Sequence, residues 1–436
     1  MAAATLEAAP EAPATPDLVK TGGITASDRG RIASIDTVRG FALLGIFLPN
    51  LYTFQGPTDQ SGIHAIFTPT MWNDVSQLFI ATFVETKFMA MFAMLFGAGA
   101  VLTLERGMRT SVWCMRCVWL IAFGMAHALF IWFGDILFMY GVSGLAIMSW
   151  ARKLSARTLL AIGVPVWLVG LALMAGVMAL GSFQQTPDFF EAMAQGPGVF
   201  MGLLMQPNPA LAEAYNTAPY GVQFMSRTLM VLIFWIFFQP LGLFWSGGLM
   251  LIGAGLAKLG FITGRSKTST YRNVLILGLL VGLPMSVVAV VWTRGVPGDG
   301  NAMRTLGAPE LALHNSLLQF FGILLSLAYI SAFNLLCRAN VAGWLTGALA
   351  VVGRMAFSNY ILCSVLAAVF FYGWGLGNFG RYEFPELWLV VIGVWGTCVL
   401  FSLAWLSAFR MGPLEWLWRT ASRLRIQPLQ RAPRSA

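Results

Sequence analysis

The chain of 436 residues is 58% hydrophobic and only 10% charged, whereas about a quarter of the residues of an ordinary soluble domain are charged. A soluble globular domain is therefore excluded, and the five cysteines exclude a small disulfide-rich domain. The formal net charge of +9 could match nucleic acid, anionic lipid or cytoplasmic loops. The positions of the Lys and Arg residues decide among these.

The first 30 residues contain no apolar run and are rich in Ala, Pro and Thr. Because a cleaved signal peptide has a short apolar core close to its start, we interpret residues 1–30 as a disordered cytoplasmic tail. Residues 31–420 are then expected to form a single transmembrane helical domain. Residues 421–436 are expected to form a basic cytoplasmic tail.

Apolar runs predict about ten transmembrane helices, since a helix needs about 20 largely apolar residues to cross the hydrocarbon core. The expected fold class is an all-α polytopic membrane helix bundle. The sixth run is too long for one straight span and contains Pro240, so it is either one long broken helix or an interfacial helix followed by a span. The ten runs are 38–54, 78–104, 112–132, 136–150, 158–181, 229–259, 274–292, 313–336, 357–372 and 387–409.

The placement of positive charge predicts the orientation. With ten spans and both termini cytoplasmic, all but five of the 27 Lys and Arg residues lie in cytoplasmic segments or at their span ends, as the positive-inside rule expects. Topology thus explains the basic balance, no nucleic-acid partner is expected, and the arginines after Arg410 are expected to face anionic lipid. The exceptions are Lys87 within a span and Arg227, Arg294, Arg304 and Arg381 outside.

The longest outer segment, residues 182–226, has no Lys or Arg but contains five prolines. We expect it to form an external loop or cap. We detect no duplicated half of the chain, which disfavours transporter folds built from visible repeats.

Ionisable residues within apolar spans are costly and point to function. Asp36 and Arg39 lie three residues apart at the predicted cytoplasmic start of the first span, so on a helix they share a face and can pair. They are either a helix-start carboxylate with a topology-setting arginine, or an anion site for a phosphate-bearing donor, to which the bidentate geometry of Arg is suited. Asn50 lies near the outer end of the same span.

Glu85 and Lys87 lie two residues apart in the second run. On a continuous helix they would project about 200 degrees from each other and could not meet one partner. A start of the deep helix near Thr86 would resolve this conflict. Glu85 would then lie in an interfacial segment.

The third cluster, GMAHALFIWFGDILFMYG, carries the most chemical information. His127 lies near the outer end of the third span, and Asp135 lies at the tip between the third and fourth spans. His127 is either a packing residue or a general base whose tautomer is fixed by Asp135. Because the tip lies roughly 12 Å beyond His127 along a straight helix, contact requires that the helix end early or that the chain fold back.

All three histidines map to the predicted outer face. His64 lies in the first outer loop, and His314 opens the eighth span. No two of the histidines have the spacing of metal ligands on a helix, so no metal site is expected.

Five motifs together resemble the YeiB family of bacterial multi-pass inner-membrane proteins, which carries a domain of unknown function. They occur in the family's order and cover nearly the whole chain after the tail. The resemblance implies a location in the bacterial inner (plasma) membrane, and the family has been loosely described as transport-related. The motifs are DTVRGFALLGI from Asp36, KFMAMFAMLFGAG from Lys87, HALFIWFGDIL from His127, GRMAFSNYILCS from Gly353 and FRMGPLEWLWR from Phe409.

The first span is also similar to that of transmembrane acyltransferases, including the enzyme that acetylates heparan glucosamine, which likewise opens with D-x-x-R-G. In that enzyme an Asn ends the span and a His follows in the next luminal loop. Asn50 and His64 occupy similar positions. The similarity thus implies a catalytic role for His64, whereas His127 and Asp135 belong to the YeiB-type pattern.

Two functions are compatible with these residues, besides a purely structural role in the bundle. A membrane acyltransferase would take a thioester donor, for which acyl-CoA is the candidate, from the cytoplasmic side near Arg39. An outer-facing histidine, either His127 supported by Asp135 or His64 near Asn50, would then deprotonate an extracytoplasmic acceptor.

The alternative is a small-molecule transporter. Asp36, Glu85, Lys87 and Asp135 would then line a polar path between helices. With either function the bilayer is a partner, no bound cofactor is expected, and the sequence is compatible with an oligomer.

Overall fold

The computed structural model of the chain describes residues 33–55, 70–183, 216–237, 239–294 and 308–431. Contacts divide the chain into two units, Met1–Arg31 and Ile32–Ala436. Every element below belongs to the second unit. The predicted tail at residues 1–30, His64 and most of the predicted cap at residues 182–226 lie outside the described residues.

The described residues form helices and contain no strand, which confirms the all-α prediction. The elements are α1 (Ala33–Gln55), α2 (Met71–Phe83), α3 (Lys87–Glu105), α4 (Thr110–Phe130), α5 (Leu137–Ala151), α6 (Ala156–Phe183), α10 (Tyr220–Phe237), α11 (Gln239–Lys258), α12 (Thr268–Leu277), a π-turn (Gly278–Gly282), α13 (Leu283–Arg294), α14 (Ala308–Ala339), α15 (Gly343–Arg354), α16 (Ala356–Phe371), α17 (Phe384–Ala408) and α18 (Pro413–Arg423).

Seven helical segments of the described residues are long and apolar enough to cross a membrane, or eight if α15 and α16, bent by 88°, form one span. The prediction of about ten also counted α1 and α5. Helix α1 carries Asp36, Arg39 and Asn50, which lower its hydropathy, and α5 has only 15 residues. Both nevertheless pack within the bundle, so the chain is a polytopic membrane-type helix bundle.

The long sixth run forms two helices. Helix α10 ends at Phe237 and α11 begins at Gln239, and α11 has the length and hydropathy of a span. Both ends of α10 lie against the predicted outer end of the bundle, because Tyr220 bonds to Phe130 and Trp235 stacks on Phe138 at 4.0 Å. The run is therefore interrupted next to Pro240, as both alternatives from the sequence require.

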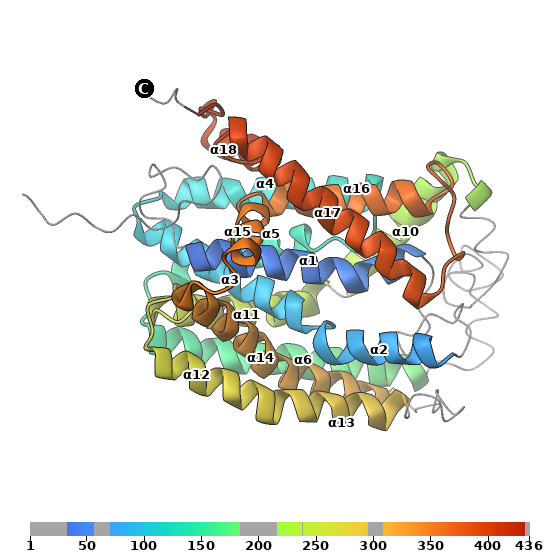
Figure 1. Ribbon diagram of the computed structural model, residues 1–436, viewed down its shortest axis with the longest axis horizontal. Coiled ribbons are helices and arrows are strands. Elements are labelled where there is room, and N and C mark those ends of the chain that lie inside the picture. Colours follow the sequence, from blue (N-terminus) through green and yellow to red (C-terminus); the bar gives the residue numbers. More distant parts are fainter. Residues whose placement is uncertain (1–32, 56–69, 184–215, 238, 295–307, 432–436) are drawn as a thin grey trace, which may run out of the picture. The chain divides into compact units, whose positions relative to one another are not determined.

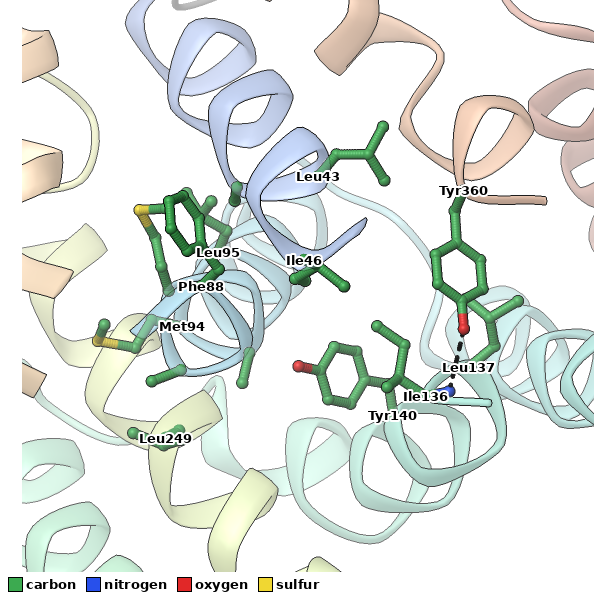
Figure 2. Packing of buried hydrophobic residues seen from close by; sticks show 14 of the residues in the cluster. Leu43, Ile46, Phe88, Met94, Leu95, Ile136, Leu137, Tyr140, Leu249 and Tyr360 are labelled. Atoms are coloured by element: carbon green, nitrogen blue, oxygen red, sulfur yellow. Dashed lines mark hydrogen bonds between the residues drawn. The ribbon is translucent and has the colours of Figure 1, made fainter. Parts of the chain in front are cut away.

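Helix α1 lies in the middle of the bundle (Figure 1), where α3, α14, α15, α16 and α17 pack around it. Leu43 and Ile46 of α1 are buried beside residues of α3 and α16 (Figure 2). At its inner end, α1 crosses α15 at backbone distance. A Cβ on Gly40 would lie 1.9 Å from the carbonyl oxygen of Leu349, and one on Gly353 would lie 1.9 Å from that of Asp36.

Helices α3 and α11 cross in the same way. A Cβ on Gly97 would lie 2.0 Å from the carbonyl oxygen of Met250, and one on Gly253 would lie 2.0 Å from that of Met94. The helices run parallel, since Lys258 and Glu105 at their C-terminal ends form an ion pair of 2.9 Å. The crossing segments are nearly identical, MLFGAGA at 94–100 and MLIGAGL at 250–256. Small residues are what allows such close approach in membranes.

Candidate functional site

His127 and Asp135 are in direct contact at the predicted outer end of the bundle. Helix α4 ends at Phe130, and the backbone N–H groups of Ile131 and Trp132 both donate to the carbonyl oxygen of His127. The chain then folds back, which brings Asp135 Oδ2 within 2.8 Å of His127 Nδ1. The early helix end that contact requires is therefore present.

Asp135 is held from two sides. Its Oδ1 accepts from the backbone N–H of Phe138 at 2.7 Å, in the first turn of α5. One turn before His127, a Cβ on Gly124 would lie 2.6 Å from the same Oδ1 and 2.3 Å from the nitrogen of Phe138. Only glycine therefore fits at position 124, and it lets α5 and Asp135 approach α4 closely.

The contact sets the tautomer of the imidazole. The side chains of His127 and Asp135 are 1% and 0% exposed. Because an ionised carboxylate only accepts hydrogen bonds, a neutral imidazole beside it donates from Nδ1 and carries its lone pair on Nε2. Nε2 is buried and has no hydrogen-bond partner among the described residues. A buried imidazole with one nitrogen oriented by a carboxylate and the other free is suited to take a proton from a ligand.

Aromatic residues from two other elements enclose the imidazole. The ring of Tyr360 on α16 lies 5.1 Å from that of His127, and its hydroxyl accepts from the backbone N–H of Ile136 (Figure 2). Trp132 lies 6.4 Å from His127 and stacks on Phe54 of α1 at 4.5 Å. The indole Nε1 of Trp132 is also buried without a partner in the described part of the chain.

A small cavity adjoins this aromatic wall between α1 and α16. Asn50, Phe54 and Tyr360 contribute to its lining. Its volume of about 10 Å³ is room for about one water molecule. Asn50 and Tyr360 thus line one cavity. Tyr360 also packs against His127.

At the other end of α1, Asp36 and Arg39 form the predicted pair, with 3.1 Å between Oδ1 and Nη1. The Asp36 side chain is 7% exposed and that of Arg39 is 27% exposed. The Arg39 guanidinium points towards Gly99 of α3. Both the topological interpretation and the donor-site interpretation agree with this geometry.

The predicted break near Thr86 is present, because α2 ends at Phe83 and α3 begins at Lys87. Thr86 has a φ of 65°, which is rare outside glycine. The break is closed by hydrogen bonds: Lys87 Nζ donates to the carbonyl of Ala81 at 2.6 Å. Two side chains of α14 do the same, since Tyr329 donates to Phe83 and Ser326 donates to Lys87.

Glu415 is a buried polar residue that the sequence did not single out. Its carboxylate accepts from the backbone N–H groups of Phe357 and Ser358 at 2.7 and 3.2 Å and from the Ser358 hydroxyl at 2.5 Å. The same hydroxyl accepts from Leu414. Burial raises the pKa of Glu415 above its ordinary value. The carboxylate thus caps α16, and Pro413 and Glu415 in the first turn of α18 were the available signal.

The comparisons with known proteins identify a family but no activity. A family model described as "Protein of unknown function (DUF418)" matches residues 256–425. This range contains Tyr360 and Glu415 but not His127 or Asp135.

Curated relatives match over almost the full chain. The chain is 32% identical to "Uncharacterized protein YeiB" of Escherichia coli over 89% of this chain and 95% of that protein. It is 28% identical to "Uncharacterized protein YxaH" of Bacillus subtilis and 25% identical to an uncharacterized 39.9 kDa protein of Bacillus acidopullulyticus, each over 92% of this chain and 96% of the relative. The chain, a membrane-type helix bundle, therefore belongs to the YeiB family, whose shared domain has no known function.

Proposed function

We propose that the protein is a bacterial inner-membrane acyltransferase that uses His127 as general base. The observation that carries this proposal is the 2.8 Å contact between His127 Nδ1 and Asp135 Oδ2, together with a buried Nε2 that has no partner among the described residues. Unpartnered buried polar atoms are rare in folded proteins, and each needs a reason. For Nε2 of His127, the reason would be that it accepts a proton from a ligand during the reaction.

In this mechanism Nε2 of His127 takes the proton from a hydroxyl or amine of an extracytoplasmic acceptor. The acceptor oxygen or nitrogen forms a bond to the acyl carbon of a thioester, and the carbon–sulfur bond breaks. His127 then passes its proton to the thiolate that leaves. Asp135 keeps the imidazole oriented and stabilises its charged form while the proton resides there.

The donor would be bound from the cytoplasmic side near Arg39, where a guanidinium can hold a phosphate such as that of acyl-CoA. Arg39 and Asn50 lie 11 residues apart on α1, which is about 17 Å along the helix. The thioester arm would have to extend over this distance to reach the outer end. Since the cavity beside Asn50 holds about one water, donor binding must separate side chains of α1 and α16.

His64 stays the second candidate for the base, and it lies outside the described residues. The transporter alternative finds support in the two interrupted helices at Thr86 and Met355, because broken helices form substrate sites in transporters. Both breaks, however, are filled by the chain itself: α14 and Lys87 satisfy the first, and Glu415 caps the second. This favours the enzyme over the transporter.

The test is acyl transfer by purified protein in lipid nanodiscs, with radiolabelled acetyl-CoA and an extracted envelope fraction as the source of acceptor. His127→Ala should reduce transfer by about 10²- to 10⁴-fold, which is the usual contribution of a general base. His64→Ala tests the other candidate. His314→Ala is the matched control, since His314 is also buried and bonds to the carbonyl of Ala289 on α13.

Loss of transfer in His64→Ala but not in His127→Ala would move the base to the first outer loop. Label that never exceeds the protein-free control with several thioester donors would contradict the enzyme. Substrate movement across sealed vesicles, sensitive to the same histidines, would then support the transporter.

A further inference from the structure

Arg227 on α10 is a cation that membrane topology does not explain. It is one of the few basic residues on the predicted outer side, where the positive-inside rule disfavours them. It is also only 6% exposed, whereas arginine is almost never buried unless it is paired. A buried outer arginine therefore needs a local reason.

One edge and one face of the Arg227 guanidinium have partners. Nη1 donates to the carbonyl oxygen of Ile131, the residue that follows the last turn of α4. A cation at a helix C-terminus is favourable. The ring of Tyr220 lies 5.6 Å from Cζ of Arg227, and its hydroxyl donates to Phe130 at 2.8 Å. These contacts fix the guanidinium against the end of α4.

The other edge is free. Nε and Nη2 of Arg227 are buried and have no hydrogen-bond partner among the described residues, whereas Arg116 and Arg152 each leave only Nε unbonded there. Nε–H and Nη2–H point in parallel, which is the geometry that binds two oxygens of a carboxylate or phosphate. No ion pair of the described residues includes Arg227, and a buried charge without a counter-charge is strongly destabilising.

Arg227 is anchored to the end of the helix that carries the proposed base. The backbone N–H of Ile131 donates to the carbonyl of His127 at 2.9 Å, so Arg227 is anchored one helical turn beyond His127, about 6 Å along the axis. Trp132 directly follows Ile131, its ring lies 6.4 Å from that of His127, and its indole N–H is also without a partner in the described ranges. An anion at Arg227 would hold the remainder of its molecule near Nε2.

We propose that the Nε/Nη2 edge of Arg227 binds an oxyanion, phosphate or carboxylate, carried by the acceptor that His127 deprotonates. The acceptor class is therefore an anionic hydroxyl or amine compound, such as one with a phosphate group. The oxyanion could belong to a lipid headgroup or to a water-soluble molecule. This inference rests on the proposed function for the role of the anion, whereas the anion site itself can be tested without any turnover.

The experiment measures thermal unfolding of the full-length protein in phosphatidylcholine nanodiscs, with inorganic phosphate or acetate against chloride at equal ionic strength. A third arm replaces part of the lipid with phosphatidylglycerol. A bound anion should raise the melting temperature of the wild type. Arg227→Gln should abolish this rise, and Arg227→Lys, which keeps the charge but loses the fork, should weaken apparent affinity about tenfold. Arg381→Gln is the matched control, because Arg381 is exposed on the same predicted side.

Stabilisation by phosphate or acetate would identify a water-soluble ligand, and stabilisation by phosphatidylglycerol alone would identify a lipid headgroup. Equal rises in wild type and Arg227→Gln, or no rise in the wild type with any of the three anions, would overturn the inference. Melting temperatures without added anion show whether each variant is folded. The wild type separates the two proposals, since a rise in melting temperature with anion in a protein that shows no acyl transfer would leave the anion site intact while the proposed function fails.

Discussion

Two clusters of buried polar groups, one at each end of this helix bundle, differ in their hydrogen bonding. At the inner end, Glu415 and Ser358 satisfy one another and the first N–H groups of two helices. At the outer end, His127, Trp132 and Arg227 each keep a buried nitrogen without a partner among the described residues. A satisfied network stabilises and orients the fold. Unsatisfied groups lower stability, and we propose that a ligand explains why they are retained.

The substitution Asp135→Asn should have the largest effect. An amide can present its N–H₂ group to Nδ1, which would place the proton of His127 on Nε2, the nitrogen that must accept. Acyl transfer should fall by about 10⁴-fold, as it does for the equivalent change in a serine protease triad. The melting temperature should change little, because the amide keeps an oxygen for Phe138. Full activity in this variant would show that Asp135 is only a helix cap.

Glu415→Ala should lower stability but leave acyl transfer intact, the reverse of Asp135→Asn. It leaves the N–H groups of Phe357 and Ser358 without their acceptor, at about 1–3 kcal/mol for each buried group. We expect a loss of about 2–4 kcal/mol in the free energy of unfolding, measured by denaturant titration in micelles, with transfer activity per folded molecule retained. In the control Glu386→Ala, which removes an exposed cap of α17, the loss should be about 1 kcal/mol or less. Equal losses in both variants would remove the distinction between the two caps.

The pH dependence of stability should show a smaller effect. Burial raises the folded-state pKa of Glu415, which lies in α18, outside the candidate spans. The folded state then holds its proton more tightly than the unfolded state, so stability is fully present below the ordinary carboxyl pKa and falls as pH rises through the raised value. Relative to Glu415→Gln, the wild type should lose at most about 1.4 kcal/mol per pH unit in this window. If the free energy of unfolding of the wild type, relative to that of Glu415→Gln, stays constant or rises with pH, the pKa of Glu415 is not raised.

The sequence predicted much of the architecture, because apolar runs and charge bias follow directly from the hydrophobicity of the bilayer. It gave a helix start near Thr86 as the way for Glu85 and Lys87 to meet one partner, and the structure has a break there. For the His127–Asp135 contact, the sequence could say only that the helix must end early or the chain must fold back. The interactions that hold this arrangement come from elsewhere in the chain: Gly124 admits the backbone of α5, and Tyr360 bonds to Ile136, 224 residues away in sequence.

Other features had weak signals or none. Arg227 was visible only as an exception to the charge rule, and its free edge depends on which carbonyl lies beside it in space. Glu415 was hidden in a motif that resembled the family, because a helix cap and a catalytic carboxylate look alike in sequence. The repeated segments MLFGAGA and MLIGAGL are short, so their relation becomes clear only where their helices cross.

That crossing of α3 and α11 has a consequence for self-association. Each helix offers the other the same glycine and the same methionine carbonyl, which is the self-complementary arrangement that a two-fold axis gives to identical partners. In proteins with one membrane helix, a face of this kind joins two molecules. In this chain the two copies of the face are buried against each other. Any association between molecules must therefore use a different surface.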